Sequence, residues 1–72
     1  MSQDARIKIA QNVKSHRKRL GLTKENLSLE LGFDNSYISK LERGNINITI
    51  DKLEKIATYF KINISDLFAD IK

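Results

Sequence analysis

The chain has 72 residues, of which 40% are hydrophobic and none is cysteine or proline. A chain of this length can bury one small core, and without cysteine it forms neither disulfides nor thiolate metal sites. No apolar run approaches the roughly 20 residues that cross a bilayer, and the N-terminus lacks an apolar signal-peptide stretch. We therefore expect a single soluble, intracellular domain over residues 1–72.

The net charge of +4 lies entirely in the first part of the chain. Residues 1–44 contain nine Lys and Arg against five Asp and Glu, whereas residues 45–72 contain four of each. A one-sided basic surface favours a polyanionic partner, with nucleic acid ahead of an anionic membrane. The alternative is an ordinary solvated surface with no partner.

Apolar residues recur at intervals of three and four, which predicts an all-α fold. Five helices are expected, at residues 4–20, 24–31, 35–43, 50–60 and 64–71. Thr23, Asp34 and Thr49 are predicted to cap the second, third and fourth helices. Two short alternating runs, 46–50 and 61–65, resemble strands but are too short and isolated to build a sheet, so we interpret them as extended connections. The fold class predicted is a compact bundle of five helices.

The second and third helices are joined by a tight turn that contains glycine, as in a helix-turn-helix. On a helical wheel of the third helix, Tyr37, Ile38 and Leu41 share one arc. The opposite arc is entirely polar and consists of Asn35, Ser36, Ser39, Lys40 and Arg43. Short hydrogen-bonding side chains at the N-terminal end of such a helix suit base edges in the major groove, although a plainly solvated helix would also be polar.

Three motifs carry a resemblance to a known family: G-L-T-x-E-x-L at 21–27, Y-I-S-K-L-E-R-G at 37–44 and L-x-K-I-A at 53–57. Together they make residues 21–68 resemble the Cro/CI-type, lambda-repressor-like (XRE) family of helix-turn-helix DNA-binding proteins. The second motif, followed by N-x-T-I, is similar to the short controller proteins of restriction–modification systems. The resemblance implies a five-helix lambda-repressor-like domain of bacterial or phage type, cytoplasmic and associated with the nucleoid.

The resemblance also implies a role for each matching position. Base edges are assigned to Asn35, Ser36 and Lys40, with Tyr37 and Ser39 flanking them. DNA phosphates are assigned to Lys24, Arg43, Asn45 and Asn47. Three residues depart from the family pattern: Lys24 replaces a frequent Gln, Asp34 replaces Ser or Thr, and Lys61 replaces the Gly that often ends the fourth helix.

Two charged residues of opposite sign occupy positions that face the core. Arg17 lies on the stripe formed by Ala10, Val13 and Leu20, and Glu42 lies on the shoulder of the apolar face of the third helix. Misplaced charges of opposite sign favour a structural ion pair, and the family resemblance points to the same pair. The alternative is that Arg17 extends outward to solvent.

The third helix is too short to read more than a few base pairs, so we expect a homodimer on half-sites about 34 Å apart. An apolar set in the last part of the chain supplies candidate interface residues, which can alternatively all belong to the core. The candidates are Tyr59, Phe60, Ile62, Ile64, Leu67, Phe68 and Ile71.

These observations predict a sequence-specific transcriptional regulator that binds double-stranded DNA in the major groove as a homodimer on a two-fold operator. The single histidine, His16, has no partners from which a catalytic or metal site is built, so we expect no enzyme, cofactor, metal or small-molecule ligand. The basic segment at residues 7–21 could instead lie on a membrane, but its apolar stripe is narrow and includes Arg17. The remaining alternative is an antitoxin-like module that uses the same domain chiefly to bind a protein.

Overall fold

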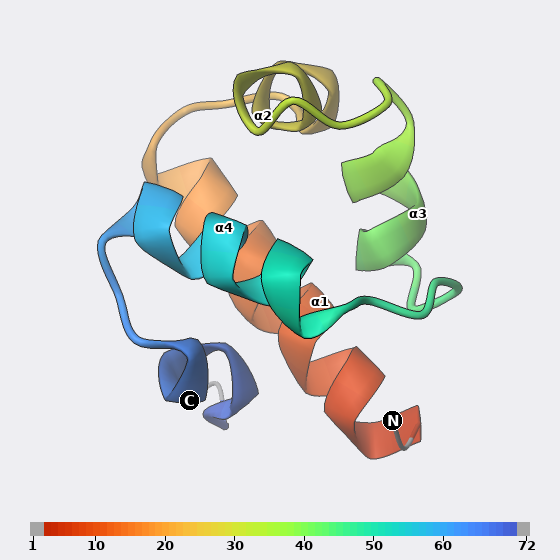
Figure 1. Cartoon of the computed structure of the whole chain (residues 1–72), viewed down its shortest axis with the longest axis vertical. Coiled ribbons are helices and arrows are strands. Elements are labelled where there is room, and N and C mark those ends of the chain that lie inside the picture. The colour runs from red at the N-terminus through yellow and green to blue at the C-terminus, as the bar shows by residue number, and fades with distance from the viewer. Residues whose placement is uncertain (1–2, 71–72) are drawn as a thin grey trace.

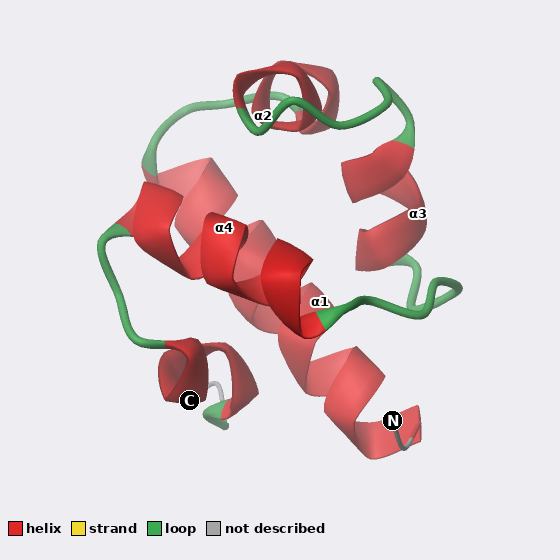
Figure 2. Cartoon of the chain, in the orientation of Figure 1, coloured by secondary structure: helices red, strands yellow, loops and turns green. Residues whose placement is uncertain are grey.

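Four α-helices and one 3-10 helix form the regular structure of residues 3–70, the part of the chain that the computed structural model describes (Figures 1 and 2). The elements are α1 (Gln3–Arg19), α2 (Lys24–Glu30), α3 (Tyr37–Glu42), α4 (Ile50–Phe60) and the 3-10 helix η1 (Ile64–Phe68). This part of the chain contains no strand, and the alternating runs at 46–50 and 61–65 form no β-pairing within it. The predicted all-α class is therefore confirmed.

Threonine side chains begin two of the helices, as predicted. Thr23 Oγ1 accepts a hydrogen bond of 3.0 Å from the backbone N–H of Asn26, and Thr49 Oγ1 accepts one of 3.2 Å from that of Lys52. Each bond satisfies a backbone donor that the first turn of a helix cannot pair internally.

The predicted cap of α3 is wrong. The helix begins at Tyr37, two residues later than expected, and its N-cap is Ser36, whose side chain makes no capping bond. The reason is a turn: the N–H of Tyr37 donates to the backbone oxygen of Asp34 at 2.9 Å, so residues 34–37 form a tight bend before the helix starts. Asp34 thus contributes its backbone and not its carboxylate.

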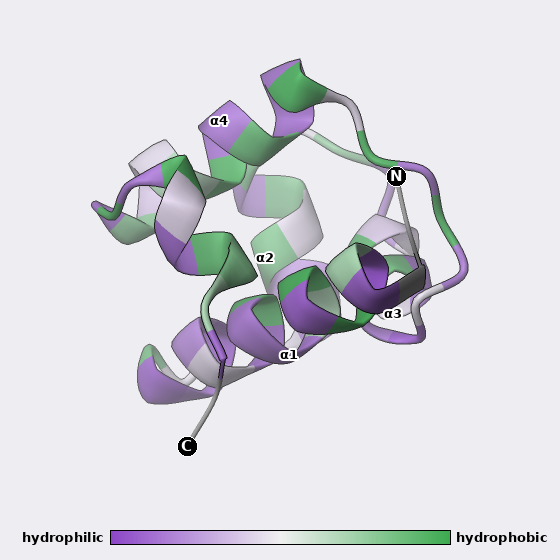
Figure 3. Cartoon of the chain, turned by 90° about the horizontal axis from the view of Figure 1, so that it is seen from below, coloured by the Kyte–Doolittle hydropathy of each residue, from purple (hydrophilic) through white to green (hydrophobic). Residues whose placement is uncertain are grey.

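The core is formed by apolar residues from every element. Val13, Leu27, Ile38, Leu53 and Leu67 are all 0% exposed. Seen from below in Figure 3, α1 and α3 lie on one side of the molecule and α4 on the opposite side. The buried stripe of α1 does not continue to its last predicted member, since Leu20 is 54% exposed.

The predicted fifth α-helix is instead the five-residue 3-10 helix η1, so the molecule has four α-helices within residues 3–70 and not five. Its bonds span three residues, as in the 3.0 Å bond from the N–H of Asp66 to the oxygen of Asn63. The buried side chain of Asn12 on α1 donates to the backbone oxygens of Leu67 and Ala69, at 2.9 and 2.8 Å. These bonds satisfy carbonyls at the end of η1 without a further helical turn.

Lys61, at the end of α4, adopts the left-handed conformation with φ 59° and ψ 42°. It is the one non-glycine residue among the described residues with a positive φ. This conformation lets the N–H of Ile62 donate to the oxygen of Ala57 at 3.0 Å, which closes the helix. A side chain at this position is strained, because its Cβ crowds the backbone.

Candidate nucleic-acid interface

A buried serine fixes α2 and α3 to each other. Ser28 is 0% exposed, and its Oγ donates to the oxygen of Lys24 at 2.9 Å while it accepts from the N–H of Ile38 at 3.1 Å. That N–H belongs to the first turn of α3, where no carbonyl of the helix itself is available. Ser28 therefore caps α3 from the neighbouring helix. It had no predicted role, and the available signal was a polar residue beside Leu27 on the inward side of α2.

The two faces of α3 differ as the helical wheel predicted. Ile38 and Leu41 are 0% and 3% exposed and belong to the core. Lys40 is exposed and Ser39 is partly exposed, and Asn35 is exposed in the turn just before the helix. The polar side chains therefore remain available to a partner while the apolar ones hold the helix in place.

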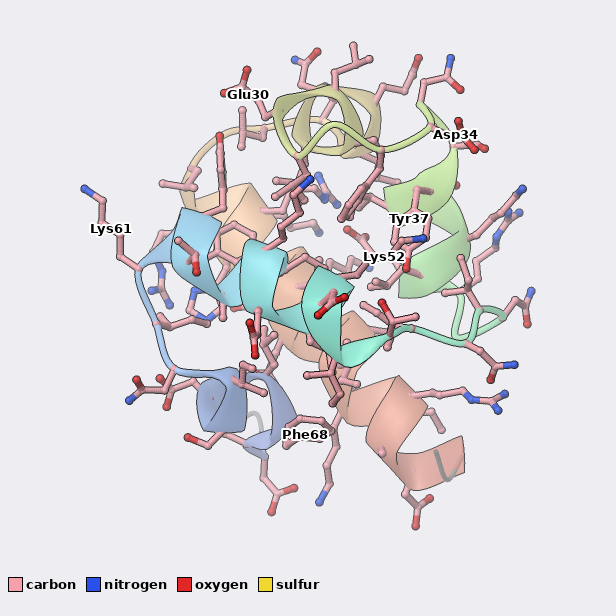
Figure 4. The ribbon with its side chains drawn as sticks, viewed as in Figure 1. Glu30, Asp34, Tyr37, Lys52, Lys61 and Phe68 are labelled. Carbon is pink, nitrogen blue, oxygen red and sulfur yellow. The ribbon has the colours of Figure 1, made fainter. Side chains whose placement is uncertain are left out.

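Tyr37 belongs to the inward face, so its predicted role in reading bases is wrong. It is 7% exposed, its ring centroid lies 4.7 Å from that of Phe33, and Lys52 Nζ lies 4.6 Å from the same ring (Figure 4). The hydroxyl is buried and has no hydrogen-bond partner within the described residues, and burial raises the pKa of Tyr37. The ring positions the start of α3 and cannot contact a base edge.

A shallow hollow of about 300 Å³ lies between the start of α2 and the start of α3. It is lined by Lys24, Glu25, Asn35, Ser36 and Ser39. Four of these five residues were predicted to contact DNA, and the fifth, an acid, had no predicted role. An ammonium group beside amide and hydroxyl groups matches the phosphate oxygens and base edges of a duplex.

The remaining predicted contact residues lie outside this hollow. Lys40 and Arg43 are exposed on and just after α3, and Asn45 and Asn47 are exposed in the following loop. They continue the polar surface from α3 toward the start of α4. The surface thus runs from the beginning of α2, along α3, into the loop at residues 43–49.

A buried ion pair supports this surface from behind. Arg17 Nε lies 2.7 Å from Glu42 Oε2, and the Nη2 of the same arginine donates to Oε1 at 3.1 Å. The two side chains are 8% and 4% exposed. Arg17 Nη1 also donates to the oxygen of Leu22 at 2.8 Å, so one guanidinium connects α1, the start of α2 and the end of α3. The expected pair between Arg17 and Glu42 is thus present.

The family model for Helix-turn-helix proteins (HTH_3) matches residues 13–67. The chain belongs to the helix-turn-helix family. The match runs from the second part of α1 into η1 and so includes the hollow, the outward face of α3 and the ion pair. Members of this family are DNA-binding regulators of transcription and not enzymes, and the same holds for this helix-turn-helix protein.

Individual relatives agree with the family match. The control protein C.MunI from a Mycoplasma species is 33% identical over 70 residues, which cover 96% of this chain and 95% of that protein. The restriction-modification controller protein C.AhdI from Aeromonas hydrophila has a solved structure with TM-score 0.80 and 32% identity, covering 92% of this chain and 96% of that one. The hypothetical transcription factor NHTF from Neisseria has TM-score 0.87 and 31% identity over 93% of this chain and 77% of that one. The predicted resemblance to the Cro/CI-type family and to controller proteins is confirmed.

The candidate dimer residues of this helix-turn-helix protein fall into three groups. Leu67 is 0% exposed and belongs to the core, so its place among the candidates is wrong. Ile71 lies outside the described residues. The other candidates are partly buried and pack against the core: Tyr59, Phe60, Ile62, Ile64 and Phe68. Ile50, which had no predicted role at an interface, is 60% exposed at the start of α4.

His16 is less exposed than its place in a basic run suggested. Its ring stacks on that of Phe60, with centroids 5.2 Å apart. Within residues 3–70, no group of three His, Cys, Asp or Glu residues is placed to hold a metal ion. None of the helices in this part combines the length and apolar character needed to span a bilayer.

Proposed function

We propose that this protein regulates transcription as a homodimer, with α3 of each protomer in the major groove of one half of a two-fold operator. The observation that carries the proposal is the orientation of α3. Ile38 and Leu41 are buried, so Ser39 and Lys40 lie on the outward face of the helix, and Asn35 is exposed in the turn just before it. A helix so arranged beside a lysine at the start of α2 suits base edges on one side and phosphates on the other.

Each exposed residue of this surface has a role that its chemistry supports. Asn35 can pair with adenine through two hydrogen bonds, and Lys40 can reach O6 and N7 of guanine. Ser36 and Ser39 add hydroxyl groups to the same face. The phosphate contacts are Lys24, Arg43, Asn45 and Asn47, which lie at both ends of the reading surface.

The small size of the reading helix supports a homodimer. α3 has six residues and is therefore roughly 9 Å long, so one copy addresses only part of a specific site. The partly buried aromatic and aliphatic residues of α4 and η1, together with Ile50, provide an apolar surface away from α3 for a second copy. The two reading helices would then lie about one helical turn of DNA apart.

The genes under control are those of a restriction–modification system. The near full-length likeness to the control protein C.MunI and to the controller protein C.AhdI supports this assignment, with the protein in the cytoplasm beside its DNA. The DNA around the gene tests it directly: we expect an inverted repeat upstream and a methyltransferase or endonuclease gene alongside. A neighbouring toxin gene and no repeat would favour the antitoxin-like alternative.

Binding measurements separate the proposed roles. Asn35→Ala and Lys40→Ala should each lose about 1–3 kcal/mol at particular base pairs of a duplex that the wild type selects from a random pool. Lys24→Ala and Arg43→Ala should weaken binding to every sequence, and each should lower the salt slope by about 0.9 per protomer. If all four variants act equally on selected and random DNA, these roles are incorrect; sedimentation of a monomer on the selected duplex would exclude the homodimer.

A further inference from the structure

Two lysines on α1 lie outside every contact assigned above. Lys14 and Lys18 are exposed, and together with Gln11 and Ser15 they line a shallow hollow of about 370 Å³ on the surface of α1. Within residues 3–70, neither lysine forms an ion pair. The neutral side chains of Gln11 and Ser15 beside two unpaired ammonium groups make this surface suited to an anion.

The contacts of Arg17 show which way this hollow faces. Arg17 points from α1 toward Glu42 on α3, with its Nε 2.7 Å from the carboxylate. At about 100° per residue, Lys14 and Lys18 follow Arg17 around α1 by roughly 60° and 100°, in the direction away from the core residue Val13. They therefore occupy the outer surface of α1 on the flank next to α3.

The same reasoning applies to α3, viewed from its own core residue. At about 100° per residue, Glu42 follows the buried Ile38 around the helix by roughly 40° and contacts α1. Ser39 and Arg43 follow in the same direction, at roughly 100° and 140°, toward the outer surface. The outer flanks of α1 and α3 thus adjoin each other above the ion pair. Figure 3 shows the two helices on the same side of the molecule, opposite α4.

Positive charge is concentrated around this junction. Arg17 and Glu42 neutralise each other beneath the surface. The exposed cations around them come from three places: Lys14 and Lys18 on α1, Lys24 two residues after Leu22, and Arg43 next to Glu42. Glu25, beside Lys24, is the acid that lines the adjoining hollow.

The opposite flank of α1 is occupied by packing and by acids. His16 stacks on Phe60 of α4, and its pKa is lowered first by burial and then by the charge of Arg19, with Asp66 acting in the other direction. Lys8 pairs with Asp70 at 3.1 Å on the same flank. Arg19 is therefore adjacent to Lys18 in sequence but lies on the side of α4 and η1.

We propose that Lys14 and Lys18 bind the phosphate backbone of DNA next to the half-site that α3 reads, so that α1 extends the footprint of each protomer. The inference rests on the proposed function, because it takes α3 to lie in the major groove. The two lysines are one helical turn apart, roughly 6 Å along α1, and can contact neighbouring phosphates of one strand. Such contacts add affinity and fix orientation but carry no sequence information.

The test compares two double variants that lose the same charge. Lys14→Gln/Lys18→Gln removes the proposed contacts, and Arg19→Gln/Lys61→Gln removes two exposed charges from the far flank of α1 and the end of α4, where Figure 4 shows Lys61 pointing away from α3. The probe is a duplex enriched by the wild type from a randomised pool. It is used in a long form, with base pairs flanking both half-sites, and in a short form that ends at them.

On the long duplex we expect Lys14→Gln/Lys18→Gln to lower the salt slope by about 1.8 per protomer, with unchanged base preference. The Arg19→Gln/Lys61→Gln control should keep most of the wild-type slope, and on the short duplex the two variants should be alike. Ethylation interference gives a second readout: flanking phosphates whose modification blocks the wild type should no longer matter to Lys14→Gln/Lys18→Gln. As a control for folding, both variants should have the same thermal unfolding midpoint as the wild type.

Equal slopes for the two double variants on the long duplex, with unchanged interference, would overturn the role of α1 and leave the proposed function intact. A change of base preference in Lys14→Gln/Lys18→Gln would also overturn it, because the lysines would then contact bases. If the wild type enriches no sequence from the pool, the proposed function fails, and the inference fails with it.

Discussion

The half of the molecule that carries the proposed DNA-binding surface and the opposite half differ in how they are stabilised. In the first, α2 and α3 have seven and six residues and are oriented by the hydrogen bonds of Ser28 and by the pair Arg17–Glu42. In the second, α4 has 11 residues and is anchored by Leu53 and Ile56, both 0% exposed. The short α2 and α3 also bury Leu27 and Ile38, but each must keep one face exposed, so polar contacts of defined geometry help to hold the reading surface in position.

Lys52 connects the two halves. From the first turn of α4 its Nζ lies 4.6 Å from the ring centroid of Tyr37 and 5.7 Å from that of Phe33. Lys55, one turn later, donates to the oxygen of Leu31 at 3.1 Å. Cation–π and hydrogen-bond contacts of this kind orient the segment between α2 and α3 against the better-packed helix. These contacts from α4 therefore fix the orientation of α2 and α3.

The largest expected effect comes from breaking the ion pair. Glu42→Ala leaves the guanidinium of Arg17 buried without its carboxylate, and we expect the free energy of unfolding to fall by about 3–5 kcal/mol. For a chain of 72 residues this is a large part of the total stability. Urea unfolding followed by circular dichroism measures the loss.

A double replacement tests whether the fold needs the two charges themselves or only a filled space without an unpaired charge. Arg17→Met/Glu42→Leu fills the same space without charge and should recover most of the stability, because no buried charge is left unpaired. A loss below about 1 kcal/mol in Glu42→Ala would mean that Arg17 finds solvent in the variant, and the contrast between the two halves would then be smaller than the structure indicates.

An intermediate effect is expected at Asn12, the polar exception in the apolar half. Asn12→Ala removes the amide that donates to the oxygens of Leu67 and Ala69, and the loss of stability should be about 1–3 kcal/mol. Since η1 carries Ile64 and Phe68, self-association should weaken along with it. Urea unfolding and sedimentation test the two effects separately. A stable variant with unchanged association would show that apolar packing alone holds η1.

The sequence allowed the fold to be predicted where the signal is local, and not where it depends on contacts between distant residues. Thr23 and Thr49 cap their helices because the partner lies three residues away, and periodicity alone places Ile38 and Leu41 inward. The end of η1 was not predicted, because it depends on Asn12, 55 residues earlier in the chain than Leu67.

The candidate site shows the same division. The wheel separated the outward residues of α3 from the inward ones, since one period determines them all. It placed Tyr37 on the inward arc, whereas the family resemblance assigned the same residue to base reading. The structure resolves this conflict because Phe33 and Lys52 enclose the ring. Ser28 was overlooked because its one signal, a polar residue on the inward side of a short helix, does not show that the side chain reaches another helix. Family resemblance supplied positions, whereas burial decided which of them are available.

The smallest expected effect is a gain in stability, and it lies in the half opposite the proposed DNA-binding surface. Lys61→Gly should raise the free energy of unfolding by roughly 0.5–1 kcal/mol, because glycine takes the left-handed conformation without strain, while its greater freedom in the unfolded chain offsets part of the gain. Lys61→Ala is the matched control: it removes the same charge but keeps the Cβ, so stability should stay within about 0.5 kcal/mol of the wild type. Affinity for the selected duplex should be the same in both variants, because the strain at the end of α4 is local. If the glycine variant bound DNA differently from the alanine variant, the backbone at residue 61 would affect the proposed DNA-binding surface. The two halves would then be coupled through the backbone as well as through Lys52 and Lys55.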